Sequence, residues 1–120
     1  MIGMPNSKQL TIAVPAYNAA SYLHTCLDSL VRSGDEVEVL VVNDGSKDGT
    51  LQVARDYAER YPGIVVAVDQ ENRNWGGAVN HALELASGTF FYIVDSDDWL
   101  DSSKLTEVVS RLRMLEEQQA

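Results

Sequence analysis

Four small polar residues with the sequence DSDD occupy positions 95–98 and carry three carboxylates, those of Asp95, Asp97 and Asp98. They follow the apolar run FFYIV at residues 90–94, which is typical of a strand buried on both faces of a sheet. Burying an unpaired carboxylate is costly, so these side chains belong just beyond the carboxyl end of that strand, where open α/β sheets bind ligands. Carboxylate oxygens in such a place suit a hard divalent cation.

Helix capping is a second interpretation of the same segment. Asp98, Asp101 and Ser102 come directly before an apolar-periodic run, and each could accept hydrogen bonds from the free N–H groups of a helix that begins there. Capping needs one or two side chains, whereas residues 95–101 include four acidic ones. The count favours metal binding, with capping as the alternative.

The elements that must position this cluster alternate along the chain. Strands are predicted at residues 10–14, 37–42, 64–68 and 90–94, and Pro15 is predicted to end the first of them. A helical apolar stripe follows each strand, and this alternation is typical of a parallel sheet with helices on both faces. The polar loops after the first, second and fourth strands should then meet at one edge of the sheet.

For four side chains near or on the helices, the sequence predicts a structural role or a solvated position. Asn18 is a candidate N-cap for the first helix. Cys26 shares the apolar stripe of that helix with leucines 23, 27 and 30, which predicts a buried structural thiol and not a nucleophile. Trp75 heads the stripe of the third helix and is predicted to belong to the core, whereas His81 lies off that stripe and is predicted to be solvated.

The composition argues against several classes of partner and compartment. A single domain is expected for 120 residues, and the net charge of −9 argues against nucleic acid and anionic membrane surfaces. Cys26 is the only cysteine, so a disulfide framework is excluded and a reducing, cytoplasmic compartment is expected. The sequence has neither an apolar run near the roughly 20 residues of a membrane span nor a signal-peptide pattern.

Motifs in four loops together resemble one family. They are VPAYN at residues 14–18, VVNDGSKDGT at 41–50, NRNWGGAVN at 72–80 and VDSDDWL at 94–100. In this order and spacing the sequence resembles the inverting, nucleotide-sugar-dependent glycosyltransferases of family two, which act in polysaccharide biosynthesis. The resemblance implies a truncated glycosyltransferase A-type fold, in which a Rossmann-like parallel sheet has helices on both faces.

The resemblance also implies roles for individual residues. Tyr17 would lie against the nucleotide base, and Asp44 would accept a hydrogen bond that suits the imide N–H of uracil, so a UDP-sugar is the expected donor. Asp97 would reach the ribose and the metal shell, and Asp98 would contact Mn²⁺ or Mg²⁺ directly. The implied nucleotide-binding set is Pro15, Ala16, Tyr17, Asn18, Asp44, Asn74, Gly77, Asp95, Ser96 and Asp97, and the implied metal set is Asp97 and Asp98.

The charge of the site gives a physical reason for the cation. Two like charges about 4 Å apart repel by roughly 4 kcal/mol at an effective dielectric near 20, and both the diphosphate and this site are anionic. Gly45 and Gly49 do not form a phosphate-binding Walker pattern, and Lys47 has the wrong spacing for one. A cation must therefore bridge carboxylate and diphosphate, and it would also stabilise the departing diphosphate.

The sequence departs from the family pattern in two ways. Asn74, with Arg73 beside it, stands where some relatives have a basic residue near the base. Inverting transfer also needs a general base, which the family carries further downstream, together with the half that binds a glycan or lipid-linked acceptor. We therefore expect residues 1–120 to be the N-terminal, nucleotide-binding portion of a larger enzyme that works in the cytoplasm or at the cytoplasmic membrane face. Such a portion should bind donor without transferring sugar, and it should self-associate through its last helix.

Three alternatives come from other classes. A phospho-receiver domain should have an acidic pair after the first strand, where Pro15, Ala16 and Tyr17 stand, and it should have a fifth strand. A nucleotidyltransferase on a related fold should have a glycine-rich, basic loop at the same place. A nucleotide-binding module that has lost catalysis stays open, because its sequence would be the same as that of a truncated enzyme.

Overall fold

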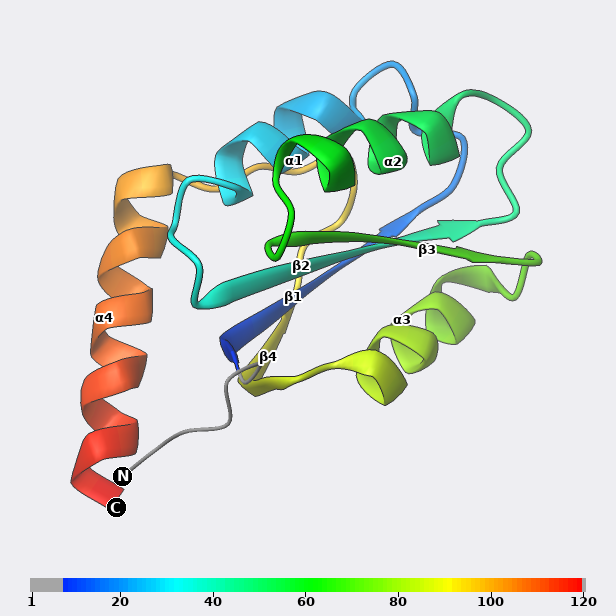
Figure 1. The fold of residues 1–120 in the computed structure, drawn as a ribbon. Helices are drawn as coiled ribbons and strands as arrows, with labels where there is room; N and C mark the ends of the chain where they lie inside the picture. Colours follow the sequence, from blue (N-terminus) through cyan, green and yellow to red (C-terminus); the bar gives the residue numbers. More distant parts are fainter. Residues whose placement is uncertain (1–7, 120) are drawn as a thin grey trace.

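The computed structural model describes residues 8–119, and its centre is a parallel sheet of four strands (Figure 1). The strands lie in the order β3-β2-β1-β4, so the chain begins in the middle of the sheet and later returns to the far side of β1. The four apolar runs predicted as strands form this sheet, with changes at their ends. The strands are β1 Lys8–Ala16, β2 Val37–Asp44, β3 Val65–Gln70 and β4 Gly88–Ile93.

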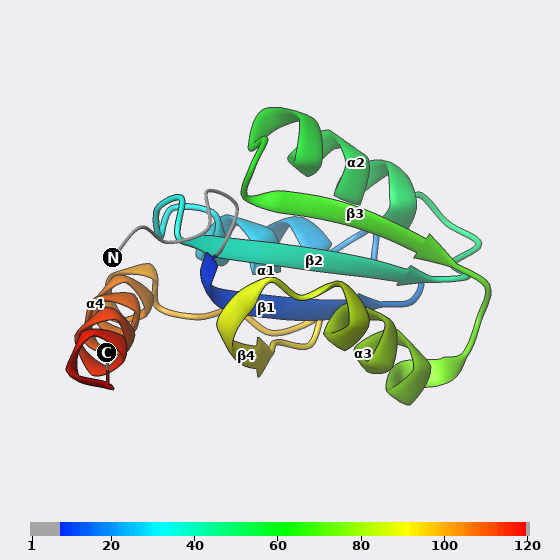
Figure 2. The same cartoon turned by 60° about the horizontal axis from the view of Figure 1, so that its bottom comes forward.

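Helices cover both faces of the sheet, which confirms the predicted α/β architecture. In both ribbon views α1 and α2 lie over one face, α3 lies over the other, and α4 stands beside the amino-terminal ends of the strands (Figures 1 and 2). The helices are α1 Leu23–Leu30, α2 Thr50–Arg60, α3 Asn74–Leu85 and α4 Ser102–Gln119. Among the described residues, none of the helices combines the length and the apolar character needed to cross a membrane.

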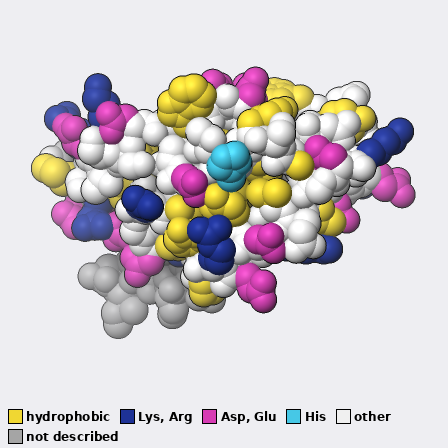
Figure 3. Space-filling view, turned by 90° about the horizontal axis from the view of Figure 1, so that it is seen from above, with side chains coloured by type: hydrophobic (Ala, Val, Ile, Leu, Met, Phe, Trp, Pro, Cys, Tyr) yellow, Lys and Arg dark blue, Asp and Glu magenta, His cyan; other side chains and the backbone are white. Residues whose placement is uncertain are grey.

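Two apolar layers hold the helices to the sheet. The larger layer lies between the sheet and α1, α2 and α4, and the predicted stripe of α1 is at most 1% exposed in it. The smaller layer lies on the face covered by α3 and consists of Ala13, Leu40, Val42, Val68, Ala78 and Ala82. Burying one large aliphatic side chain contributes about 1.5–3 kcal/mol, so these layers are the main source of stability. The outer surface over α1 and α2 has acidic and basic side chains interspersed (Figure 3).

β1 continues through Pro15, contrary to the prediction that this residue ends the strand. Pro15 pairs with Val42 in the parallel register between β1 and β2. The carbonyl of Ala13 accepts a hydrogen bond from Val94 N on the β4 side, and residues two apart on a strand face the same way. Pro15 therefore faces a position where β4 has already ended, so the N–H that proline lacks costs no sheet hydrogen bond.

β4 is an edge strand, so the prediction that it is buried on both faces is wrong. It pairs with β1 and lies at the end of the strand order, and its Tyr92 is 53% exposed. The other apolar residues of β4, Phe90, Phe91 and Ile93, are half-buried. Hydrophobic periodicity describes the faces of a strand and not its place in the sheet, which is why this edge strand has the pattern of a central one.

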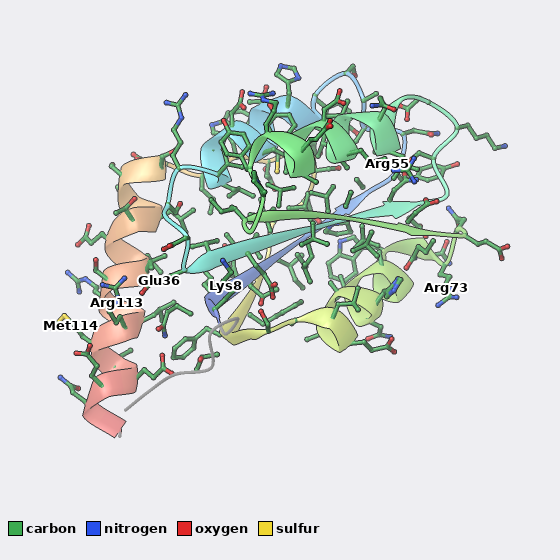
Figure 4. All side chains as sticks on the ribbon, viewed as in Figure 1. Lys8, Glu36, Arg55, Arg73, Arg113 and Met114 are labelled. Carbon is green, nitrogen blue, oxygen red and sulfur yellow. The ribbon has the colours of Figure 1, made fainter. Side chains whose placement is uncertain are left out.

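An apolar groove of about 550 Å³ lies between β4 and α4. α4 packs on the core through Leu105 and Val109, and Arg113 pairs with Glu36 just before β2, where the two side chains point toward each other (Figure 4). Most of the groove lining is apolar and includes Phe90, Tyr92, Leu100, Leu105, Val108 and Leu112. α4 therefore leaves part of the apolar surface of β4 open.

A buried polar cluster fixes the start of β4 against β1. Glu38 Oε2 accepts hydrogen bonds from Thr11 Oγ1 and from Ser87 N, each at 2.6 Å, and Thr11 Oγ1 accepts one from Gly88 N at 2.8 Å. Thr11 is fully buried and Glu38 is 9% exposed. A Cβ at position 88 would lie 2.5 Å from Thr11 N, so this contact requires glycine.

Gly88→Ala should lower the free energy of unfolding by about 1–3 kcal/mol, because its Cβ would overlap the backbone of β1. Gly76→Ala is the matched control. It lies on α3 with nothing within 4 Å of the new Cβ, and it should stabilise by up to about 1 kcal/mol through helix propensity. Denaturant unfolding of both variants checks this, and equal stabilities would show that the close approach at Gly88 is not a constraint.

Candidate functional site

Loops from neighbouring strands meet at the carboxyl edge of the sheet, as predicted. After β1 the chain passes to β2 on one side, whereas β4 lies on the other side, so the topological switch point lies between β1 and β4. A pocket of about 90 Å³ opens at this edge, lined by Pro15, Ala16, Tyr17, Asp44, Trp75 and Ala78. The first four of these residues belong to the predicted nucleotide-binding set, and the structure brings them together.

Asp44 is the charged residue of this pocket, and it is almost fully buried at 4% exposure. Its Oδ1 accepts hydrogen bonds from Gln70 Nε2 at 2.9 Å and from Arg73 N at 2.6 Å. Its backbone carbonyl accepts a third from Asn72 Nδ2 at 3.1 Å. A carboxylate oxygen has two lone pairs, so Oδ1 is saturated and Oδ2 remains for a ligand.

His81 hydrogen-bonds to Gln70, which itself hydrogen-bonds to Asp44, so the prediction that His81 is solvated is wrong. It is half-buried on α3, and its Nδ1 lies 2.7 Å from Gln70 Oε1. An amide oxygen only accepts, so Nδ1 carries the proton and donates it. His81 thus orients Gln70, which in turn donates to Asp44. This pairing joins positions 11 residues apart and has no local sequence signal.

Asn18 links the loops after β1 and β2 and does not cap α1, so the predicted N-cap is wrong. α1 begins at Leu23, and Asn18 has a φ of +48°, in the left-handed region that asparagine tolerates better than most residues. Its Oδ1 accepts a hydrogen bond from Lys47 N at 2.8 Å, and its own N–H donates to Ser46 Oγ at 2.9 Å. The side chain is exposed and does not line the pocket.

Asp48 and Thr50 strengthen the same link between the two loops. Asp48 accepts hydrogen bonds from the hydroxyl and the N–H of Thr50 and from Ala20 N, the last at 3.2 Å. These bonds, led by that of the Thr50 hydroxyl, lower the pKa of Asp48 below its ordinary value. Thr50 Oγ1 accepts a further bond from Ala19 N at 2.7 Å. The backbone beside the pocket is therefore held by the chain's own hydrogen bonds.

Trp75 lines the pocket and is 54% exposed, so the prediction that it belongs to the core is wrong. Ala78, Val79 and Ala82 on the same helix are buried, but Trp75 lies in the first turn, next to the carboxyl edge. Its Nε1 donates to Asp95 Oδ1 at 2.9 Å. The signal in the sequence is its position, a tryptophan in the first turn of a helix that begins at the carboxyl edge of the sheet.

The DSDD segment leaves β4 with its carboxylates on the outside. Asp98 N donates to the carbonyl of Asp95 at 2.9 Å, and the side chains of Asp97 and Asp98 are exposed. Between residues 8 and 119, no three His, Cys, Asp or Glu side chains converge on one point that could hold a metal. The donor set therefore does not form a protein cage. It fits the magnesium pattern in which one or two carboxylates share the ion with ligand phosphates.

Cys26 lies beneath this segment, and its Sγ is 3.7 Å from the carbonyl of Asp95. Burial, followed by the charges of Asp98, Asp97 and Asp95, raises the pKa of the Cys26 thiol to about 12. The thiol therefore stays protonated near neutral pH, which agrees with the predicted structural role.

Asp101 alone provides the predicted capping of α4. Its Oδ1 accepts hydrogen bonds from the hydroxyl and the N–H of Ser103, at 2.6 Å and 3.0 Å, and its pKa is lowered mainly by the first of these. Ser102 Oγ instead donates to the carbonyl of Ser29 at 3.1 Å. Capping therefore uses one acidic residue, and it does not explain the exposed carboxylates of Asp97 and Asp98.

Asn74, Gly77 and Ser96, which the resemblance also assigned to the nucleotide, do not line this pocket. Asn74 has a φ of +67° at the turn into α3. Gly77 makes room for Arg73, because a Cβ at position 77 would lie 2.4 Å from the Arg73 Cβ. Figure 4 shows Arg73 at the carboxyl edge of the sheet. The local conformation of the chain around the start of α3 therefore explains Asn74 and Gly77 without a ligand contact.

Sequence comparison relates nearly the whole chain to one family. The family model described as glycosyl transferase family 2 matches residues 11–118. The putative glycosyltransferase EpsH of Bacillus subtilis (strain 168) is 38% identical over 93 residues, which are 77% of this chain and 27% of EpsH. The chain spans between 15% and 35% of the length of the curated relatives that it matches.

Comparison with solved structures gives the same assignment. The structure of S. aureus TarS residues 1–349 in complex with UDP-GlcNAc matches this chain with a TM-score of 0.75 and 29% identity. The match covers 88% of this chain and 31% of the TarS chain. The structure of the mannosyltransferase PcManGT from Pyrobaculum calidifontis, in complex with GDP-Man and Mn²⁺, matches this chain with a TM-score of 0.72 and 31% identity. The match covers 86% of this chain and 32% of the PcManGT chain. The sequence and the fold therefore agree that this chain belongs to glycosyl transferase family 2 and has its glycosyltransferase A-type fold.

Proposed function

We propose that this chain binds a nucleoside diphosphate sugar at the carboxyl edge of its sheet, with the base in the pocket of Tyr17 and Asp44. The observation that carries the proposal is the pocket itself, in which exposed aromatic side chains and one buried carboxylate lie at the carboxyl edge of β1 and β2, and Trp75 joins this pocket to the acidic segment after β4. Two structural relatives, solved with UDP-GlcNAc and with GDP-Man, support this class of donor.

The proposed base is uracil, because of the hydrogen bonds that Asp44 already accepts. Arg73 N and Gln70 Nε2 both donate to Oδ1, which leaves Oδ2 as the available acceptor. Uracil presents one imide N–H on its Watson–Crick edge, which one oxygen satisfies. Guanine presents two neighbouring donors, which are best matched by both oxygens of a carboxylate. A UDP-sugar is therefore the proposed donor.

Mn²⁺ or Mg²⁺, held by Asp97 and Asp98, is proposed as the cofactor. When bound, the ion would neutralise the diphosphate and stabilise it as a leaving group. The chain's own residues keep these two carboxylates exposed and anchor the start of their segment through Trp75 and Cys26. Without the ion, each pair of like charges about 4 Å apart would repel by roughly 4 kcal/mol at an effective dielectric near 20.

The proposed reaction of the longer protein is inverting transfer of the sugar to an acceptor hydroxyl. The acceptor class is a glycan or a lipid-linked sugar, and both the general base and the acceptor site are proposed to lie outside these 120 residues. On this proposal the chain alone binds donor but lacks the group that removes the acceptor proton, which typically contributes about 10²–10⁴-fold in rate. The cytoplasmic location expected from the sequence stays a prediction.

UDP should bind this chain in the presence of Mg²⁺ or Mn²⁺ and bind about tenfold or more weakly in the presence of a chelator, because of the charge repulsion at the site. GDP and ADP should bind less tightly than UDP with the same ion. Isothermal titration calorimetry measures all of these affinities. Equal affinity with and without the ion would refute the metal bridge, and a preference for a purine would refute the base assignment.

Asp98→Ala should remove the metal dependence of UDP binding and leave the free energy of unfolding unchanged, since its side chain is exposed. Asp101→Ala is the matched control three residues away. It should lower the stability by about 0.5–2 kcal/mol through loss of the α4 cap and should keep metal-dependent binding. Titrations and thermal melts of both variants test this pair. The opposite pattern would assign the acidic segment to capping.

Self-association of the chain is proposed to use the open edge of β4 and the neighbouring groove, occupied by a second copy. An edge strand presents unpaired N–H and C=O groups that pair readily with another strand. Val108→Glu in the groove should therefore give a monomer, whereas Val66→Glu on the opposite edge strand β3 should associate like the wild type, although the two residues have similar exposures of 45% and 43%. Light scattering over a dilution series measures this. A wild-type monomer at every concentration would contradict it.

A further inference from the structure

Trp75 combines features that a structural residue does not need. Trp75 lines the pocket and is 54% exposed, and its Nε1 donates to Asp95 Oδ1 at 2.9 Å. This hydrogen bond joins the first turn of α3 to the residue that follows β4 by two positions. Large aromatic side chains with one polar atom are most useful where an apolar face and a hydrogen bond are needed together, as at binding sites.

The backbone before Trp75 holds the indole in this place. Asn74 has a φ of +67°, which is uncommon for a residue other than glycine and is retained only where its surroundings demand it. The preceding residue, Arg73, donates its N–H to Asp44 Oδ1 at 2.6 Å. The turn that places Trp75 is therefore hydrogen-bonded to the carboxylate of Asp44 in the pocket. Asp44, Trp75 and Asp95 form one connected unit.

We infer that Trp75 is a second aromatic wall for the nucleotide base and also the positioning residue for Asp95. The inference rests on the proposed nucleotide function. A base in the pocket contacts both Tyr17 and Trp75, because both rings line it. The indole N–H occupies Oδ1 of Asp95 and fixes the rotamer of that carboxylate. On this inference Oδ2 of Asp95 is presented to a ribose hydroxyl, in place of Asp97, to which the resemblance assigns the ribose. Base binding and ribose binding are thus coupled through one side chain.

Substitutions at position 75 separate the two roles. Trp75→Ala removes both the ring and the donor, and it should weaken binding of UDP with Mg²⁺ by about 10- to 100-fold, the usual effect of losing a base–aromatic stack. Trp75→Phe keeps a ring and removes the donor, and it should weaken UDP by about three- to tenfold. Trp75→Phe should leave the affinity for 2′,3′-dideoxy-UDP unchanged, because that ligand lacks the hydroxyls that Asp95 would bind. Trp75→Ala should weaken both ligands.

Tryptophan fluorescence gives a readout that a purely structural role would not produce. The sequence contains two tryptophans, Trp75 and Trp99, and Trp99 is 66% exposed and does not line the pocket. In Trp99→Phe the remaining indole should be quenched in proportion to bound UDP. In Trp75→Phe, which keeps Trp99, the emission should not follow binding. Thermal melts of all variants establish that each is folded.

The possible failures are distinguishable. If the wild-type chain does not bind UDP with Mg²⁺ in calorimetry, the proposed function and this inference are both overturned. If the wild type binds UDP but Trp75→Ala binds it equally well and Trp75 is not quenched, only this inference is overturned. If Trp75→Phe weakens UDP and dideoxy-UDP by the same factor, the ring is a wall but the positioning of Asp95 is refuted.

Discussion

The two hydrogen bonds that Asp44 Oδ1 accepts, from Gln70 Nε2 and Arg73 N, are the interaction on which the carboxyl edge depends. Asp44 ends β2 at 4% exposure, and a carboxylate is tolerated there because fixed donors replace the water it has lost. The same bonds hold the turn after β3, and this turn places Trp75 at the pocket. The carboxylate of Asp44, at the end of β2, therefore holds the loop between β3 and α3 in place and also provides a polar atom of the pocket.

This arrangement concentrates negative charge at an edge proposed to receive an anionic ligand. Asp44 and the three carboxylates of residues 95–98 lie at the carboxyl ends of β2 and β4, and the chain as a whole has a net charge of −9. A phosphate that arrives without a cation meets repulsion here, in contrast to the glycine-rich, basic cradles of other nucleotide-binding folds. The chemistry of the edge is thus consistent with the proposed ligand, a nucleotide that carries its own counter-ion, and the proposed selectivity for uracil would then depend on Oδ2 of Asp44 alone.

Local pattern predicted much of this fold, and the errors have physical causes. The stripe of α1 and the strand–helix order follow from short-range periodicity, so they could be read from the sequence. The edge position of β4 and the continuation of β1 through Pro15 depend on which strands are neighbours, and periodicity does not describe that. Tyr17 and Asp44 could be predicted for the site through the resemblance to the family, and the structure places both at the carboxyl edge, where Tyr17 follows β1 and Asp44 ends β2. For Trp75 the helical stripe predicts burial, and only its place in the first turn of α3 indicates that it is exposed at the pocket.

The pocket between Asp44, Tyr17 and Trp75 is the proposed nucleotide site. Amide and indole NMR shifts during titration of the isotope-labelled chain with UDP and Mg²⁺ test it most directly. The largest shifts are expected at the Arg73 amide, whose N–H donates to Asp44, at the Trp75 indole N–H and along the DSDD segment. Shifts confined to the groove between β4 and α4, or no shifts at saturating UDP, would contradict it.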